Sequence, residues 1–281
     1  MLISAVESIG GGTPREIANA HTVFNVANAL IFLPFVNQFA TLVTRLVPDK
    51  PDPRAMHPKY IDDGLVSTPE LALSKARMEM LRMASRVRGM LADVLPAVLD
   101  GDIDDLADVE AMDDEVDGLH GLILQYLGRI SQSKLSEASS DEMMDLMEAT
   151  NALEAIGDII ETNVVALGIQ RIETNVEVSD VTREVIGTLH AAVFDAFDLA
   201  LVAVTQKDQA AAHQVSAMKS TIRDLERDAV LHQAERLVVD EPNRVANYRL
   251  EIDLIANLKR IYYFTRRIAR VAVPEEEQAT L

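Results

Sequence analysis

The chain has 281 residues, 45 of them acidic and 26 basic, so its formal net charge is −19. This charge argues against nucleic acid as a partner, because affinity for nucleic acid comes mainly from Lys and Arg side chains that neutralise phosphates. The sequence contains no cysteine, which excludes disulfide bonds and thiolate metal ligands. Aromatic residues make up only 4% of the chain, and Ala, Leu, Glu and Met are abundant, so we expect an all-α protein.

The first predicted element is an apolar helix. Residues 23–43 contain no charged side chain, and about 20 such residues span the hydrocarbon core of a bilayer. Polar side chains recur along it, and Asn25 and Asn28 could line a transport path or bond to neighbouring helices. We interpret 1–47 as a membrane segment, with a buried helix of a soluble domain and a signal peptide as the alternatives.

The flanking charges predict an orientation. Arg45, Lys50, Arg54 and Lys59 follow the apolar run, whereas only Arg15 precedes it. By the positive-inside rule the C-terminal bulk would lie in the cytoplasm. One helix does not make a transport path, so we expect the chain to be the C-terminal portion of a longer polytopic protein.

A connector and three helices are predicted next. Four prolines make residues 48–66 a stiff polar connector that cannot continue a helix. Ser67-Thr68-Pro69-Glu70 has the spacing of a capping box and predicts a helix from there to about Leu99. A second helix is expected at about Ile103–Ile130, and a third from a capping box at Ser139-Ser140-Asp141-Glu142 to about Ile172.

The chain then repeats itself at a nearly constant offset. Seven residues between Ala97 and Leu119 recur 106 positions later, and Leu153 and Ile156 recur 105 positions later. This pattern indicates a duplicated three-helix unit. The predicted units are 67–175 and 176–273, the second with helices at about 181–205, 209–238 and 243–273, and an acidic tail follows at 274–281.

Two helices of the first unit carry paired acids. Asp113 and Asp117, with Glu110 one turn before them, lie on one face of the second helix, and Glu154 and Asp158 lie on one face of the third. Carboxylates from two helices can hold Mg²⁺, Ca²⁺, Mn²⁺, Fe or Zn. A solvated acidic face is the alternative interpretation.

The second unit has lost these acids. The matching positions hold Lys219, Arg223, Lys259 and Tyr263. We therefore predict divalent or iron-type metal ions in the first unit only, and an anion contact or simple helix packing in the second.

The acid-bearing motif resembles a known family. Leu153-Glu154-Ala155-Ile156-Gly157-Asp158 is similar to the L-E-R-I-G-D signature of PhoU domains, with Ala155 in place of Arg, and Asp113-Xaa3-Asp117 resembles the partner motif on the preceding helix. The resemblance covers roughly residues 67 to 273. It implies a six-helix bundle whose acid pairs bind metal clusters, although residues 253–261 depart from the motif in the second unit.

The order of the segments resembles bacterial sodium/phosphate cotransporters. Ala20-His21-Thr22-Val23-Phe24-Asn25 is similar to the opening of a late membrane helix in that family, which also has a PhoU-like tail. The resemblance implies Na⁺-coupled symport of inorganic phosphate by a complete protein of the inner (plasma) membrane. This chain would supply its last membrane helix and a cytoplasmic regulatory domain. A homo-oligomer through either part is a further expectation.

Two other functions are distinguishable from this one. A stand-alone PhoU-type metal-binding regulator of phosphate uptake and signalling is the main alternative. A carboxylate-bridged metalloenzyme would have Glu-Xaa2-His motifs on two helices, and the sequence has none. We therefore expect no catalytic residues and no enzymatic activity.

Overall fold

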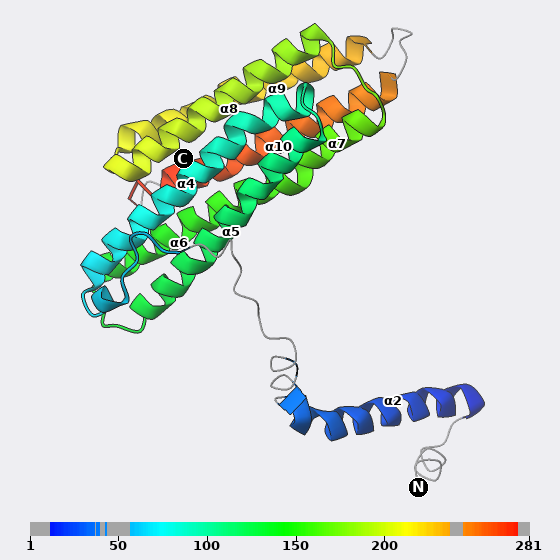
Figure 1. Cartoon of the computed structure of the whole chain (residues 1–281), viewed down its shortest axis with the longest axis vertical. Helices are drawn as coiled ribbons and strands as arrows, with labels where there is room; N and C mark the ends of the chain where they lie inside the picture. The colour runs from blue at the N-terminus through cyan, green and yellow to red at the C-terminus, as the bar shows by residue number, and fades with distance from the viewer. Residues whose placement is uncertain (1–11, 37, 40–42, 44–56, 237–243, 275–281) are drawn as a thin grey trace. The chain divides into compact units, whose positions relative to one another are not determined.

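The structure is a computed structural model that describes residues 12–36, 38–39, 43, 57–236 and 244–274. The chain forms two compact units, Met1–Ala55 and Met56–Leu281. Within the described residues every regular element is a helix (Figure 1), which confirms the predicted all-α class.

The N-terminal unit contains α2 (Gly12–Phe32) and a 3₁₀ turn, η1 (Leu33–Phe35). Pro34 lies in this turn, where it cannot donate the amide hydrogen bond of an α-helix. Large apolar side chains of the unit are more than half exposed, with Leu30 at 69% and Leu33 at 71%. Such a surface needs an apolar partner or a lipid environment to cover it.

The predicted span at 23–43 is not tested by the structure, because residues 37 and 40–42 lie outside the described part. The described apolar stretch there is His21–Phe35, which is shorter than a spanning helix. Among the described residues, only α8 (Asp180–Gln206) is long and apolar enough to cross a bilayer, and a third of its most apolar window is buried. Since α8 packs against α4, α9 and α10, we interpret it as a core helix of the bundle.

The second unit is a bundle of long helices. They are α4 (Pro69–Leu99), α5 (Ile103–Ile130), α6 (Glu137–Asp158), α7 (Val165–Glu173), α8, α9 (Gln209–Arg236) and α10 (Arg244–Arg270). A π-helix, η3 (Ile159–Val164), joins α6 to α7 without a break, so these three segments form the single third helix that the sequence predicts. The prediction missed the π-helix, in which each turn holds an additional residue.

Helix starts differ from the predicted capping boxes. Thr68 precedes α4 but makes no side-chain cap, since Pro69 already fixes the first helical residue. The α6 helix begins two residues earlier than expected, capped by Ser136, whose hydroxyl accepts a hydrogen bond from the Ser139 amide at 3.2 Å. A capping box does occur at the start of α5, between Asp102 and Asp105.

The two three-helix sets pair through corresponding helices. In the first set α4 packs on α5 and α6, and in the second α8 packs on α9 and α10. Between the sets, α4 packs on α8 and α6 on α10, and all these helices run roughly along one direction (Figure 1). This is the pairing that two copies related by a twofold rotation produce, with α5 and α9 outside the shared interface.

Ion pairs reinforce the interface between the sets. The guanidinium of Arg88 on α4 donates to both carboxylate oxygens of Asp198 on α8 at 2.6 and 2.9 Å, and its charge lies 4.7 Å from the ring centroid of Phe194. Arg267 on α10 donates to Glu148 on α6 at 3.2 Å. The two parallel hydrogen bonds from Arg88 to Asp198 fix the relative position of α4 and α8, in addition to the attraction between the charges.

Residues 57–66, the second half of the predicted connector, lie against the bundle. Glu79 of α4 is fully buried, and its carboxylate accepts hydrogen bonds from the backbone amides of Lys59 and Tyr60 at 2.9 and 2.8 Å. Arg82 balances this charge at 2.7 Å. Farther along, the hydroxyl of Tyr126 on α5 donates to the Asp62 carbonyl at 2.8 Å.

Removal of the Glu79 carboxylate should release this segment. Glu79→Ala leaves two backbone amides without their acceptor and removes the carboxylate that pairs with Arg82. We therefore expect a loss of about 2–4 kcal/mol in the free energy of unfolding, measured by urea titration. Trypsin should also cleave after Lys59 faster than in the wild type. Asp93→Ala, an exposed acid on the same helix, is the matched control, and equal cleavage rates in both variants would contradict the proposed anchoring.

Candidate metal centre

Three of the predicted acids converge where α5 meets the end of α6. Asp113 and Asp117 lie one turn apart on α5, and Asp158 is the last residue of α6. One carboxylate oxygen from each lies within 4.8 Å of the other two. Asp113 is buried, with 4% of its surface exposed, whereas Asp117 and Asp158 are exposed. The cluster therefore has one buried acid and two acids that face solvent.

Gly157 allows Asp113 to reach this position. A Cβ atom added at Gly157 would collide with the Asp113 carboxylate and would approach Val116 at 3.3 Å. The absence of a side chain lets the backbone of α6 accept a carboxylate from α5 at close range. The Gly-Asp pair of the motif is thus explained physically: Gly157 makes the space for one acid, and Asp158 supplies another.

The environment of Asp113 disfavours an isolated negative charge. Burial, followed by the charges of Asp117, Glu161 and Asp158, raises the pKa of Asp113 to about 7. Its Oδ1 atom has no hydrogen-bond partner within the described part of the chain. A buried carboxylate oxygen without a donor is uncommon, and a bound cation is one of the groups that can satisfy it.

Glu154 and Glu110 differ in their relation to the cluster. Glu154 is half-buried, and burial together with the charge of Asp158 raises its pKa. Positive charge on His120 lowers the pKa of Glu154 and so opposes this rise. The Nε2 atom of His120 lies 3.0 Å from Oδ1 of Asn151. Glu110 is exposed on α5 and is not among the three acids whose oxygens converge.

Glu161 is an acid that the sequence analysis missed. It is partly buried in the π-helix, and its charge raises the pKa of Asp113. Glu161 follows Asp158 by three residues, whereas the other acid pairs were identified by a spacing of four. π-Helical turns within α-helices occur often at functional sites, and this one begins directly after Asp158.

Asn25 and Asn28, the predicted path residues, lie on α2 in the N-terminal unit. Asn25 is exposed and Asn28 is partly exposed. They lie three residues apart, so they share a face of the helix. Their proposed role in a transport path stays a prediction.

The acidic cluster fits a hard cation. Its donors are all carboxylate oxygens, which suit Mg²⁺, Ca²⁺, Mn²⁺ and iron rather than soft metals. Oxygens within 4.8 Å of one another can meet around an ion that binds each at roughly 2.0–2.6 Å. Asp113, Asp117 and Asp158 would hold the ion, with Glu154 and Glu161 close enough to add negative charge.

Comparison with known proteins identifies the same region. The family model described as PhoU domain matches residues 80–164, from the first third of α4 through the π-helix. Two solved structures share the fold, each with a TM-score of 0.66. PhoU from Pseudomonas aeruginosa is 21% identical and covers 74% of this chain and 97% of its own; the phosphate transport system regulatory protein PhoU from Streptococcus pneumoniae is 14% identical and covers 76% and 97%.

Curated relatives extend the similarity along the chain. Proteins named "Putative inorganic phosphate export protein YjbB" from Escherichia coli K12 and Salmonella typhimurium are each 23% identical, over 242 and 259 residues. These alignments include 86% and 92% of this chain. The chain spans 44% and 48% of the length of these relatives.

The raised pKa of Asp113 predicts how the metal-free protein responds to pH. The folded state keeps this proton up to a pH of about 7, whereas the unfolded chain loses it near its ordinary value of 3.8. The resulting stability is fully present below about pH 4 and is lost as the pH rises through about 7. In EDTA, the free energy of unfolding should fall over this range by on the order of 2–4 kcal/mol more in the wild type than in Asp113→Asn.

A neighbouring acid provides the control for this measurement. Asp108→Asn removes an exposed carboxylate from the same helix and should keep the pH dependence of the wild type. Parallel pH profiles for the wild type and Asp113→Asn would show that Asp113 does not titrate in this range.

Proposed function

We propose that this chain is part of a membrane protein that transports inorganic phosphate, and that its helical bundle is a metal-binding regulatory domain of that protein. The chain combines a PhoU domain with an exposed apolar N-terminal helix. Its curated relatives carry phosphate export in their name. The bundle would lie in the cytoplasm beneath the inner membrane and would have no catalytic activity.

The extent of the similarity to the curated relatives is the observation that carries this proposal. The unit Met56–Leu281 contains 226 residues (281 − 55). The alignment with the Salmonella relative includes 92% of the chain, or 259 residues, so at least 33 of them (259 − 226) come from the N-terminal unit. The similarity therefore includes apolar sequence in addition to the bundle.

A stand-alone PhoU-type regulator, the alternative, accounts for less of the chain. Almost the whole Pseudomonas PhoU structure, 97%, corresponds to only 74% of this chain. The N-terminal unit carries an apolar helix for which a soluble regulator has no evident use. Membrane attachment gives this segment a physical role, since lipid would cover its exposed apolar side chains.

A cation in the acidic cluster would give the bundle its regulatory capacity. Asp113 and Asp117 on α5 lie close to Asp158 on α6, and the negative charges of these three side chains repel one another. A bound divalent or iron-type ion neutralises these charges and supplies the missing partner of the Asp113 oxygen. Loss of the ion would weaken the contact between α5 and α6, so occupancy could alter the contact that the bundle makes with the transport domain.

The finer details of transport are also part of the proposal. Coupling to Na⁺ would make the complete protein a sodium/phosphate symporter, whereas the relatives' printed name states export and does not mention sodium. The direction of a coupled carrier follows the gradients of its solutes, so the two descriptions are compatible. Asn25 and Asn28 on α2 would line the path or bind a neighbouring helix, and self-association through α2 or the bundle would complete the assembly.

Metal analysis tests the regulatory site. The full chain, purified in detergent, should retain about one or more ions of Mn, Fe, Ca or Mg per chain, as measured by inductively coupled plasma mass spectrometry. We expect Asp117→Asn combined with Asp158→Asn to lower affinity at least about tenfold, because only one carboxylate ligand remains. Gly157→Ala should have a similar effect, since its methyl group displaces Asp113.

Matched controls separate loss of the site from loss of the fold. Gly121→Ala adds the same methyl group in open space on α5, and Asp108→Asn removes an exposed acid from that helix. Both should retain the metal content of the wild type. If the site variants also keep their metal, the cluster does not bind it.

Transport assays test the proposed activity. Proteoliposomes that contain the complete protein should move radiolabelled phosphate, and Asp117→Asn with Asp158→Asn should change the rate severalfold without changing the amount of protein. A Na⁺ gradient replaced by K⁺ tests the coupling ion separately. No phosphate movement under any gradient would contradict transport, and equal rates in Na⁺ and K⁺ would contradict symport alone.

A further inference from the structure

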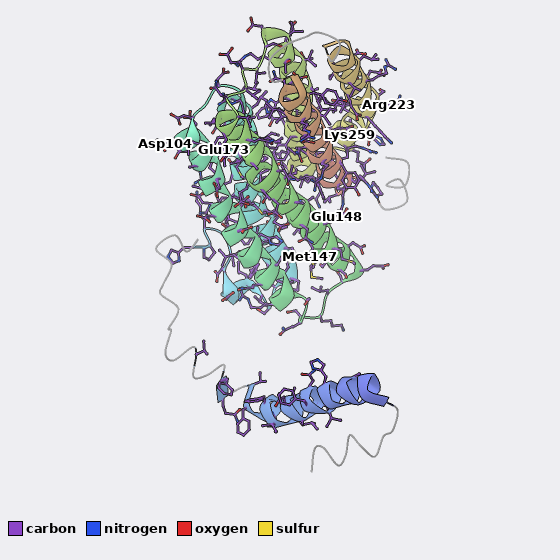
Figure 2. All side chains as sticks on the ribbon, turned by 90° about the vertical axis from the view of Figure 1, so that its right-hand side faces the viewer. Asp104, Met147, Glu148, Glu173, Arg223 and Lys259 are labelled. Carbon is purple, nitrogen blue, oxygen red and sulfur yellow. The ribbon has the colours of Figure 1, made fainter. Side chains whose placement is uncertain are left out.

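The second three-helix set has a groove at the position that corresponds to the acidic cluster. The groove has a volume of about 330 Å³ and lies between α9 and α10. Figure 2 labels one of its residues on each helix, Arg223 on α9 and Lys259 on α10. Its principal side chains are Lys219, Arg223, Lys259, Tyr262, Tyr263 and Arg266.

The groove carries bases at most of the positions that correspond to acids in and around the acidic cluster. At the offset of 106, Asp113 and Asp117 correspond to Lys219 and Arg223. At the offset of 105, three further residues correspond in the same way: Glu154 to Lys259, Asp158 to Tyr263 and Glu161 to Arg266. Five acids are thus replaced by four bases and a tyrosine, and all five replacements line one groove.

Lys219 and Arg223 are not balanced by acids that line the groove. Among the described residues, Glu226 is the one acidic side chain in the lining, and it pairs with Lys259 at 2.7 Å. Within the described residues, no carboxylate forms an ion pair with Lys219 or Arg223. Four bases against one acid give the groove a net positive charge in a chain whose total is −19. Helix packing alone does not need such an excess of positive charge, because like charges on neighbouring turns repel one another.

The lining of the groove defines the size and chemistry of a ligand. Ligand sites in proteins usually have volumes from about 300 Å³ upward, so a groove of 330 Å³ can hold a small organic molecule as well as a simple anion. Tyr262 is part of the groove lining and occupies the position that corresponds to Gly157. Its hydroxyl donates a hydrogen bond to the Val215 carbonyl at 2.7 Å. Tyr262 itself is buried, so the exposed ring of Tyr263 supplies the apolar surface beside the cations.

We propose that this groove binds the phosphoryl group of a small molecule, either free phosphate or an organic phosphate. Arg and Lys are the side chains that recognise phosphoryl groups, through hydrogen bonds supported by full charges. Arg223, Lys219 and Lys259 bind the phosphoryl oxygens, and the exposed ring of Tyr263 contacts the body of an organic phosphate. The site is separate from the acidic cluster, and its existence does not depend on the proposed transport function.

Calorimetric titration of the full chain tests this site directly. The protein is kept in detergent with EDTA, so that no metal ion in the acidic cluster can bind the probe. ATP and inorganic phosphate are the two probes, and their comparison identifies the source of the phosphoryl group. At least one should bind with one molecule per chain, and Lys219→Ala with Arg223→Ala should weaken that binding at least tenfold.

Two controls make the outcome decisive. Arg227→Ala removes an exposed arginine of α9 that pairs with Asp224 and lies outside the groove lining; it should change affinity less than twofold. Circular dichroism checks that the double variant folds, as expected because Lys219 and Arg223 are exposed. Binding of neither probe at millimolar concentration, or equal affinity in the double variant, would overturn the proposal. So would binding only to phosphatidylglycerol vesicles, which would identify a membrane contact instead.

Discussion

The pairing of corresponding helices determines where the bundle can carry chemistry. Because α4 packs on α8 and α6 packs on α10, the first and third helices of each set are used to build the interface. The second helices, α5 and α9, remain outside it, and each meets the third helix of its own set along an accessible seam. The acidic cluster lies on one seam and the basic groove on the other. A single packing solution has therefore produced two equivalent positions with opposite charge.

The two seams also differ in the size of one side chain, at the position where the two helices of each seam approach each other. Gly157 leaves room for a carboxylate to approach the backbone of α6, and Tyr262 fills the corresponding place in the second set. Cation ligands must converge within a few ångströms, so an acidic seam gains from a glycine at its closest point. A groove for a larger anion does not need its ligands to converge so closely, so a tyrosine can fill this place beneath it. The shape of each seam thus suits the charge of the ligand that we assign to it.

Much of the bundle could be predicted from its sequence, because the apolar periodicity and breaks such as Gly101-Asp102 mark the helices closely. The same patterns could not show the burial of Asp113, since that depends on how closely α5 approaches Gly157 in three dimensions. They also missed Glu161, because its place near the cluster depends on the π-helix. Capping boxes were predicted less well: Pro69 and Ser136 began their helices by other means. The membrane span at 23–43 remains a prediction.

The anchoring of residues 57–66 determines which part of the bundle would respond to the N-terminal segment. The described hydrogen bonds of this stretch reach Glu79 and Arg82 on α4, Tyr126 on α5 and Ser133 after it. All of these partners belong to the acidic set. Tension on the chain would therefore act first on α4 and α5, of which α5 carries Asp113 and Asp117. The basic set would receive this tension only through the shared interface. The two halves of the bundle are therefore mechanically unequal. Residues 57–66 bind the acidic set directly, and the basic set is connected to them only through the acidic set.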